Sequence, residues 1–337
     1  MRSSLLTTAL LLSASLSSVI ALSVPRNLPT AFWERRHDKA LEKRAISPPF
    51  PEDAQDKDLQ QELKSQDATF NEWEPGWVPR ACVEEATNGK FSASELEVRD
   101  VFYDDCEAAW TVCRHRNATE SWETIILTLS QVPVGMRQYA SNIVILAEFG
   151  EPGVAAYARG SVLTFYPTVF TSLGVIMHEF SHILDMVVLA GPMQAYGYPA
   201  DTPFSHSHMW AEAYNSDSRV PSEYARTNLL EDFADAGRWA VSDVVHPGGL
   251  AKYSRDWIHC RSQIAAYETL LADIIFPKGN VCTAKAPSSE PMSIGEIEET
   301  ENAKLYQPKG TLEGTMLSAI VLPPKASERL IVCRVPI

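Results

Sequence analysis

Residues 171–189 read TSLGVIMHEFSHILDMVVL, an apolar stretch that contains a few ionisable side chains. Its apolar residues cover almost the whole helical surface, which is typical of a helix buried at the centre of a domain. The ionisable residues are His178, Glu179, His182 and Asp185. Such groups on a buried apolar helix destabilise the fold unless a metal ion balances them. The stretch therefore predicts a central helix that carries a polar site.

The central helix contains the pattern H-E-x-x-H. His178 and His182 are four residues apart, so both rings lie on one helix face, about 6 Å apart along the axis. Two imidazoles and a carboxylate suit Zn²⁺, which keeps a fourth position open for water in catalytic sites. Glu179 lies about a quarter turn aside, where its carboxylate can take a proton from that water. We therefore expect a zinc site on this helix.

Such a site needs a third protein ligand, and several classes of metallopeptidase differ in its location. Metzincins continue the motif to a glycine and a third histidine, but Asp185 and Val188 stand at those positions, so that class is excluded. His206 and His208 are possible ligands. Their polar loop favours ordinary surface histidines.

Glu231 is the better candidate for the third ligand. It lies in a stretch that is predicted to be a second helix over residues 227–241, among apolar neighbours such as Phe233 and Trp239. Asp235 follows one turn later on the same face. A carboxylate at that position accepts the second ring N–H of a histidine ligand and makes the ligand more basic.

The segment around Glu231 also carries a family resemblance. Residues 221–236, PSEYARTNLLEDFADA, resemble the third-ligand segment of gluzincin metallopeptidases of the anthrax lethal factor type. That family has Ser-x-Tyr-Gly/Ala-x-Thr-Asn, then the ligand Glu, then Phe-Ala-Glu/Asp. Its active helix reads His-Glu-Phe-Gly-His with an aspartate three residues later, similar to residues 178–185. The resemblance covers residues 175–240, about a fifth of the chain.

The resemblance implies a role for each matching residue. His178, His182 and Glu231 would bind Zn²⁺, and Glu179 would be the general base. Tyr224 would steady the oxyanion or assist the leaving amine. The implied activity is that of a secreted zinc endopeptidase, which hydrolyses peptide or protein substrates with metal-activated water. The alternative is a non-catalytic secreted zinc-binding protein of degenerate peptidase fold.

The sequence departs from that family at several positions. Ser181 replaces the usual glycine, Asp235 is shorter than the common glutamate, and residues 229–230 are apolar where polar residues are usual. These differences affect the expected substrate preference more than zinc binding. Asp185 and Asp235 are not expected to bind the metal ion themselves; they are expected to orient the zinc ligands.

The order of elements predicts an α+β fold: a zincin-like domain with a small mixed sheet, the central helix and a helical C-terminal half. A strand is expected over residues 142–146, and a hairpin over residues 154–165 would turn at Gly160. That hairpin would provide the edge strand that pairs with an extended substrate. A further strand is expected over residues 124–129, and the last long helix over residues 255–276.

The N-terminal region reads as a series of processing segments. Residues 1–21 resemble a signal peptide, and residues 22–44 a pro-segment that ends at a dibasic pair, as in a zymogen. Residues 45–80 are acidic and proline-rich, which predicts an extended arm. The metallopeptidase domain would then comprise residues 81–337.

Composition indicates the environment of the protein. The formal net charge of −14 disfavours nucleic acid as a partner, and the only strongly apolar segment outside the core is the signal peptide, so we expect no membrane contact of the mature form. Asn117 begins an N-glycosylation sequon, which predicts a glycoprotein. The prediction is a secreted, extracellular protein.

The cysteines support this localisation. Six cysteines in an exported chain predict three disulfides, although they allow fifteen pairings. The pairings expected from proximity in sequence are Cys106–Cys113 and Cys260–Cys282. Cys82 would then form a disulfide with Cys333.

Overall fold

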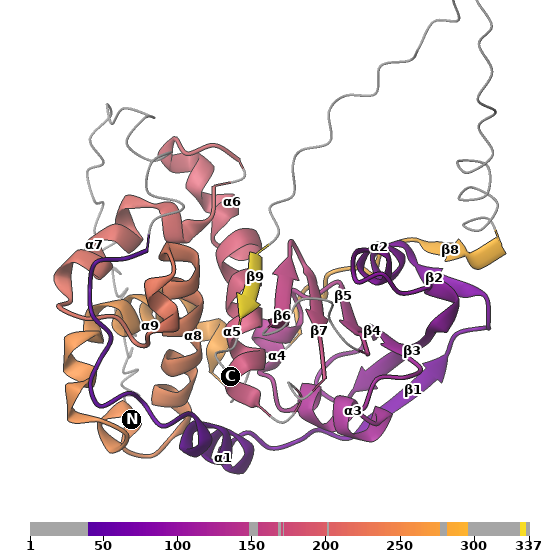
Figure 1. Ribbon diagram of the computed structural model, residues 1–337, viewed down its shortest axis with the longest axis horizontal. Helices are drawn as coiled ribbons and strands as arrows, with labels where there is room; N and C mark the ends of the chain where they lie inside the picture. The colour runs from indigo at the N-terminus through magenta and orange to yellow at the C-terminus, as the bar shows by residue number, and fades with distance from the viewer. Residues whose placement is uncertain are drawn as a thin grey trace, which may run out of the picture.

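A mixed sheet and a set of helices make up the computed structural model, which describes residues 40–147, 154–167, 170, 172–200, 202–276, 282–295 and 331–334. The strands and helices alternate in the first half, and helices dominate the second half. Figure 1 shows the sheet on one side and the helical half on the other, with the helix α5 (Leu173–Ile183) between them. The predicted α+β class with a mixed sheet is confirmed.

The main sheet has seven strands in the order β1-β3-β4-β5-β7-β6-β9. Neighbours at both ends of the sheet are antiparallel, whereas β4, β5 and β7 run parallel. In sheet order the strands are Ala68–Glu72, Leu96–Tyr103, Trp110–His115, Asn142–Ile145, Val162–Phe165, Val154–Arg159 and Ile331–Arg334. A smaller sheet pairs β2 (Trp77–Pro79) with β8 (Pro291–Ser293).

The strand and hairpin over residues 142–165 are close to their predicted positions. β5 is fully buried, and β6 and β7 form an antiparallel hairpin that turns at Gly160, whose φ of +55° suits a residue without a side chain. However, β6 also pairs with β9. The prediction that the hairpin provides a free edge strand for a substrate is therefore wrong.

The acidic stretch over residues 45–80 is not an extended arm. It forms the helix α1 (Glu52–Glu62) and the strands β1 and β2. Leu59 and Leu63 are buried in the main core, and the carboxylate of Asp56 accepts a hydrogen bond from the backbone N–H of Gly174 at 2.8 Å. Burial of this apolar face stabilises the helix despite its acidic composition.

The end of the predicted pro-segment lies along residues 218–226. The N–H of Leu41 donates to the carbonyl of Arg226 at 2.7 Å, and the N–H of Val220 donates to the carbonyl of Arg44 at 3.1 Å. The remainder of the predicted pro-segment and the whole predicted signal peptide lie outside the described residues. Cleavage after Arg44 stays a prediction.

The strand predicted over residues 124–129 is wrong, because this stretch belongs to the helix α3 (Trp122–Ser130). The hydroxyl of Ser121 caps the helix by accepting a hydrogen bond from the N–H of Thr124. Ile125 and Leu129 lie on one helix face and are both buried. The β-branched composition suggested a strand, but the spacing of the buried residues is that of a helix.

Two disulfides join segments that lie far apart in sequence. They are Cys82–Cys113 and Cys106–Cys282, so the three expected pairings are wrong. Cys260 is a buried free thiol among the described residues. The side chain of Cys333 lies outside the described residues. Pairing of sequence neighbours failed because the fold brings more distant cysteines together.

The C-terminal half is helical, as predicted. Its longest helices are α8 (Leu229–Val245) and α9 (Arg261–Ile275), and it also contains α5, α6 (Ala190–Met193) and α7 (His208–Ser216). The helices α2 (Arg80–Asn88) and α4 (Val134–Arg137) belong to the first half of the chain. In the described part of the chain one helical stretch, Leu173–Tyr196, is apolar and long enough to span a bilayer, but 72% of its most apolar window is buried inside the domain. It serves as a core helix here.

Candidate metal centre

The first part of the candidate site is the helix α5. The hydroxyl of Ser172 accepts a hydrogen bond from the N–H of Val175 and thereby fixes the start of the helix. From this start His178 and His182 lie one turn apart, with ring centroids separated by 4.9 Å. The helix continues into η4 (Leu184–Val188), a π-helical turn. Such turns occur frequently near functional sites.

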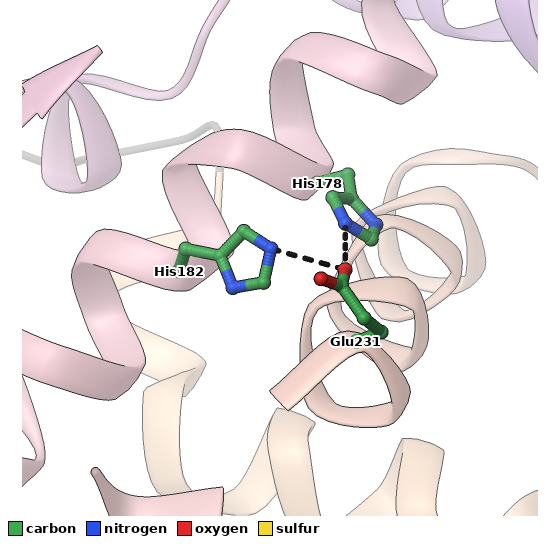
Figure 2. A group of neighbouring side chains, drawn as sticks. All are labelled: His178, His182 and Glu231. Atoms are coloured by element: carbon green, nitrogen blue, oxygen red, sulfur yellow. Dashed lines mark hydrogen bonds and ion pairs between the residues drawn. The ribbon is translucent and has the colours of Figure 1, made fainter. Parts of the chain in front are cut away.

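The second part is the first turn of α8. The side chain of Asn228 caps this helix by accepting hydrogen bonds from the N–H groups of Leu230 and Glu231, at 2.9 and 3.0 Å. This cap fixes the backbone at Glu231. The carboxylate of Glu231 then extends toward α5, as Figure 2 shows.

The three side chains meet at a buried point between α5 and α8 (Figure 2). One oxygen of Glu231 lies 3.1 Å from Nε2 of His178 and 3.3 Å from Nε2 of His182. One ligand atom from each residue lies within 4.8 Å of the others. The exposed fractions of His178, His182 and Glu231 are 1%, 0% and 2%. The structure therefore brings together the three predicted zinc ligands.

The donor set fits a small divalent cation. Ligands bound to zinc at about 2.0–2.1 Å lie about 3.3 Å apart at the corners of a tetrahedron, close to the two distances around Glu231. Nδ1 of His182 has no hydrogen-bond partner in the part of the chain that the structure describes, and Nε2 of the same ring lies 3.3 Å from the carboxylate of Glu231. A buried polar atom without a hydrogen bond is costly, and a bound cation removes that cost.

The electrostatics of Glu231 agree with a cation at this point. Burial raises the pKa of Glu231, but the charge of His182 and the hydrogen bonds of His178 and His182 lower that pKa to about 2. The carboxylate is therefore ionised throughout the physiological range. A buried carboxylate needs positive charge beside it, which a bound metal ion would provide when the two imidazoles are neutral.

Asp235 lies behind His178. Its Oδ1 is 3.7 Å from Nδ1 of His178 and 3.3 Å from Nε of Arg238. Burial raises the pKa of Asp235, whereas Arg238 and His178 lower it, and the net shift is downward. Arg238 also forms an ion pair with Glu52 at 2.6 Å. The helix α1 is thus connected to the side of the site that faces away from Glu231.

Asp185 holds a loop. Its Oδ1 accepts a hydrogen bond from the backbone N–H of Ser205 at 2.7 Å, and burial raises its pKa to about 6. Ser205 lies in η6 (Phe204–His206), a short turn that precedes α7. Asp185 therefore fixes this turn beside the central helix, which differs from the direct ligand support expected from the sequence.

The two residues predicted to be catalytic lie close to the cluster. Glu179 is fully buried next to His178 in α5. Tyr224 lies in η7 (Tyr224–Arg226), and its ring centroid is 5.6 Å from that of His178. Asn117 is exposed in the loop that precedes α3.

The two loop histidines do not join the cluster within the described residues. His206 is only 4% exposed, so the prediction of a surface histidine is wrong for this residue. Nδ1 of His208 lies 2.6 Å from the hydroxyl of Tyr198. Asp185 explains the burial of His206, because it anchors the turn against α5.

Some residues that position the site carried no recognisable sequence signal. Gly237 lets α8 approach α5 closely, and Tyr267 of α9 packs at the same place. The hydroxyl groups of Ser181 and Tyr267 share a hydrogen bond at 2.8 Å. Ser181, which appeared as a departure from the family pattern, thus ties α5 to α9. The sequence signal for this close packing is the position of Gly237 inside an apolar helical stretch.

The comparisons with known proteins point away from peptidases. The profile of the family described as "Conidiation-specific protein Con-13" matches residues 53–263. A curated relative from Neurospora crassa, "Conidiation-specific protein 13", is 31% identical over 176 residues, which make up 52% of this chain and 49% of the relative. The chain therefore spans about half the length of this relative. No solved structure matches the chain.

This family match corrects the main functional prediction. The residues that suggested a gluzincin peptidase of the anthrax lethal factor type lie inside the matched region, and neither name describes a protease. The predictions of an enzyme, of a hydrolase or metalloprotease with a peptide substrate, and of a zymogen are wrong. Short motifs on two helices describe the geometry of a possible metal site and do not determine a reaction.

Proposed function

Because the chain belongs to the Con-13 family of conidiation-specific proteins, we propose that it is a non-catalytic, secreted zinc-binding protein. The ligands are His178, His182 and Glu231. The observation that carries the proposal is the buried meeting of their donor atoms within 4.8 Å. Two imidazoles and one carboxylate favour zinc over magnesium or calcium, which prefer oxygen ligands.

The bound zinc would hold two helices together. His178 and His182 come from α5, and Glu231 comes from α8. A cation shared by the two helices stabilises the folded chain, because the unfolded chain does not keep these side chains together. The zincin-like fold that was expected from the sequence remains a prediction.

Export of the protein is supported by the sequence and by the disulfides. Residues 1–21 have the pattern of a signal peptide, and disulfides persist in oxidising compartments. The two bridges Cys82–Cys113 and Cys106–Cys282 fit that environment. The name of the Neurospora crassa relative places that protein in conidiation. As part of the proposal, we infer that the present chain also acts during conidiation.

Thermal unfolding tests zinc binding by the intact protein. At neutral pH, zinc at about 100 times its dissociation constant is expected to add about 2.7 kcal/mol of stability. For a domain of this size that raises Tm by about 5–10 °C. The increase shrinks toward pH 5, because protonated imidazoles do not bind metal.

Magnesium at the same concentration provides the control, and it should leave Tm unchanged. The zinc-loaded protein is also expected to leave casein intact, with or without a chelator. Absence of any zinc-dependent increase at neutral pH would overturn the metal proposal. Digestion of casein that a chelator stops would overturn the non-catalytic part.

A further inference from the structure

A hollow of about 360 Å³ lies at the β1 end of the main sheet. Figure 1 shows β1, β2, β3 and α3 together at this end, away from the helix α8, which carries Glu231. We call the hollow the tryptophan pocket; its main lining residues are Trp73, Glu74, Trp77, Glu97, Arg99 and Trp122. Three tryptophans around one surface hollow are unusual, because aromatic side chains are normally buried in a core.

Two of the three indole rings are held by hydrogen bonds. Nε1 of Trp73 donates to Asp100 at 2.9 Å, and Nε1 of Trp122 donates to Glu97 at 2.9 Å. Trp77 remains 45% exposed. A pocket whose aromatic walls are already fixed loses little conformational entropy when a ligand binds.

Arg99 provides a fixed polar group beside these rings. Its guanidinium lies 4.1 Å from the ring centroid of Phe70 and 4.4 Å from that of Trp122. It also forms an ion pair with Glu72 at 2.5 Å. Stacking on the two rings fixes the plane of the guanidinium. Hydrogen-bond donors and acceptors therefore lie next to apolar ring faces.

The lining of the pocket holds three glutamates and one arginine, and two of the glutamates form ion pairs. Glu72 pairs with Arg99, and Glu97 pairs with Arg114 at 3.1 Å. Glu74 is the remaining acidic residue of the lining. Because Glu72 and Glu97 are already paired with arginines, the lining offers fixed hydrogen-bonding groups, which suit a ligand that carries many hydroxyl groups.

We propose that the tryptophan pocket binds a pyranose sugar of an oligosaccharide. A pyranose ring presents C–H groups on its faces, which pack on indole rings. Its hydroxyl groups around the rim donate to carboxylates and accept from a guanidinium. The volume of about 360 Å³ lies within the range of small-molecule sites. This binding does not depend on the metal centre.

Calorimetric titration of the full chain tests the proposal. The probes are cellohexaose, laminarihexaose, chitohexaose and mannohexaose, with choline as a cationic probe. At least one oligosaccharide should bind, and Trp77→Ala should weaken that binding by about tenfold, as expected for loss of one stacked ring. Trp77→Phe keeps a ring face and should retain most of the affinity.

The matched control is Tyr196→Ala, which removes an aromatic side chain that is 49% exposed outside the pocket. It should leave sugar binding unchanged. The proposal is overturned if no oligosaccharide binds to either the unaltered chain or Asn117→Gln, if only choline binds, or if Trp77→Ala and Tyr196→Ala have equal effects. Thermal unfolding of each variant shows whether its fold is intact.

A second arm distinguishes two sources of the sugar. Asn117 is exposed and lies close to Trp122 in sequence, so a glycan attached there could supply the bound pyranose. The titrations are therefore repeated with Asn117→Gln. Binding in both forms supports a free oligosaccharide, and binding only after Asn117→Gln supports the chain's own glycan. Absence of binding in both forms overturns the proposal.

Discussion

Replacement of Glu231 by alanine is expected to lower the zinc affinity of this protein by about a hundredfold or more. Loss of an outer partner alone lowers metal affinity by about 10–100-fold, and Glu231 itself is a proposed ligand. Its carboxylate lies within 3.3 Å of both imidazoles, so its removal leaves two of the three proposed ligands. Competition with a chromophoric chelator measures the affinity.

The matched control for Glu231→Ala is His206→Ala. His206 is another buried ionisable residue, 4% exposed, but it does not belong to the cluster of donor atoms. Its replacement should change the zinc affinity little. An equal loss of affinity in both variants would show that the ligand assignment is wrong, provided that both variants keep their circular dichroism spectrum.

The second large effect is expected from Gly237→Ala. A Cβ atom at Gly237 would lie 2.3 Å from Oγ of Ser181 and 2.6 Å from Cε2 of Tyr267, so α8 must move away from α5. Overpacking of this kind costs about 1–3 kcal/mol. Alanine stabilises a helix by about 1 kcal/mol relative to glycine. The replacement therefore lowers stability only if the cost of the steric clash exceeds that gain.

We therefore expect Gly237→Ala to lower Tm by several degrees and to weaken zinc binding, because the histidines and Glu231 separate. Gly191→Ala is the control: its added Cβ meets no atom within 4 Å. Chemical denaturation and zinc titration of both variants measure the two effects. A Gly237→Ala protein as stable as Gly191→Ala would show that the close approach of α5 and α8 is not required.

The central elements were predictable because their patterns are long and consistent. The apolar run over residues 171–189 indicated α5, and Asn228 with the periodic stretch after it indicated α8. The hairpin at Gly160 followed from its alternation and its glycine. These elements hold the candidate ligands, so the geometry of the cluster could be anticipated from the sequence.

Other parts of the fold depend on contacts that a sequence pattern does not show. The helix α1 is acidic, but Leu59 is buried in the main core. The pairings Cys82–Cys113 and Cys106–Cys282 join residues that only the tertiary fold brings together. Local composition carries no information about partners that are distant in sequence.

The functional prediction failed for a different reason. H-E-x-x-H with a distant glutamate specifies donor atoms, and the same donors can serve a non-catalytic metal site. The residues of the tryptophan pocket come from β1, β2, the loop between them, β3 and α3, and no motif unites them. Only the folded chain shows that Trp73, Trp77 and Trp122 surround one hollow.

The central claim is that one zinc ion joins α5 to α8, and metal analysis of the purified, secreted protein tests it most directly. Mass spectrometry of the dissolved protein should find one zinc ion per chain, and the double variant His178→Ala/His182→Ala should contain none. Absence of zinc from the unaltered protein, or retention of the full amount in the double variant, would contradict the account.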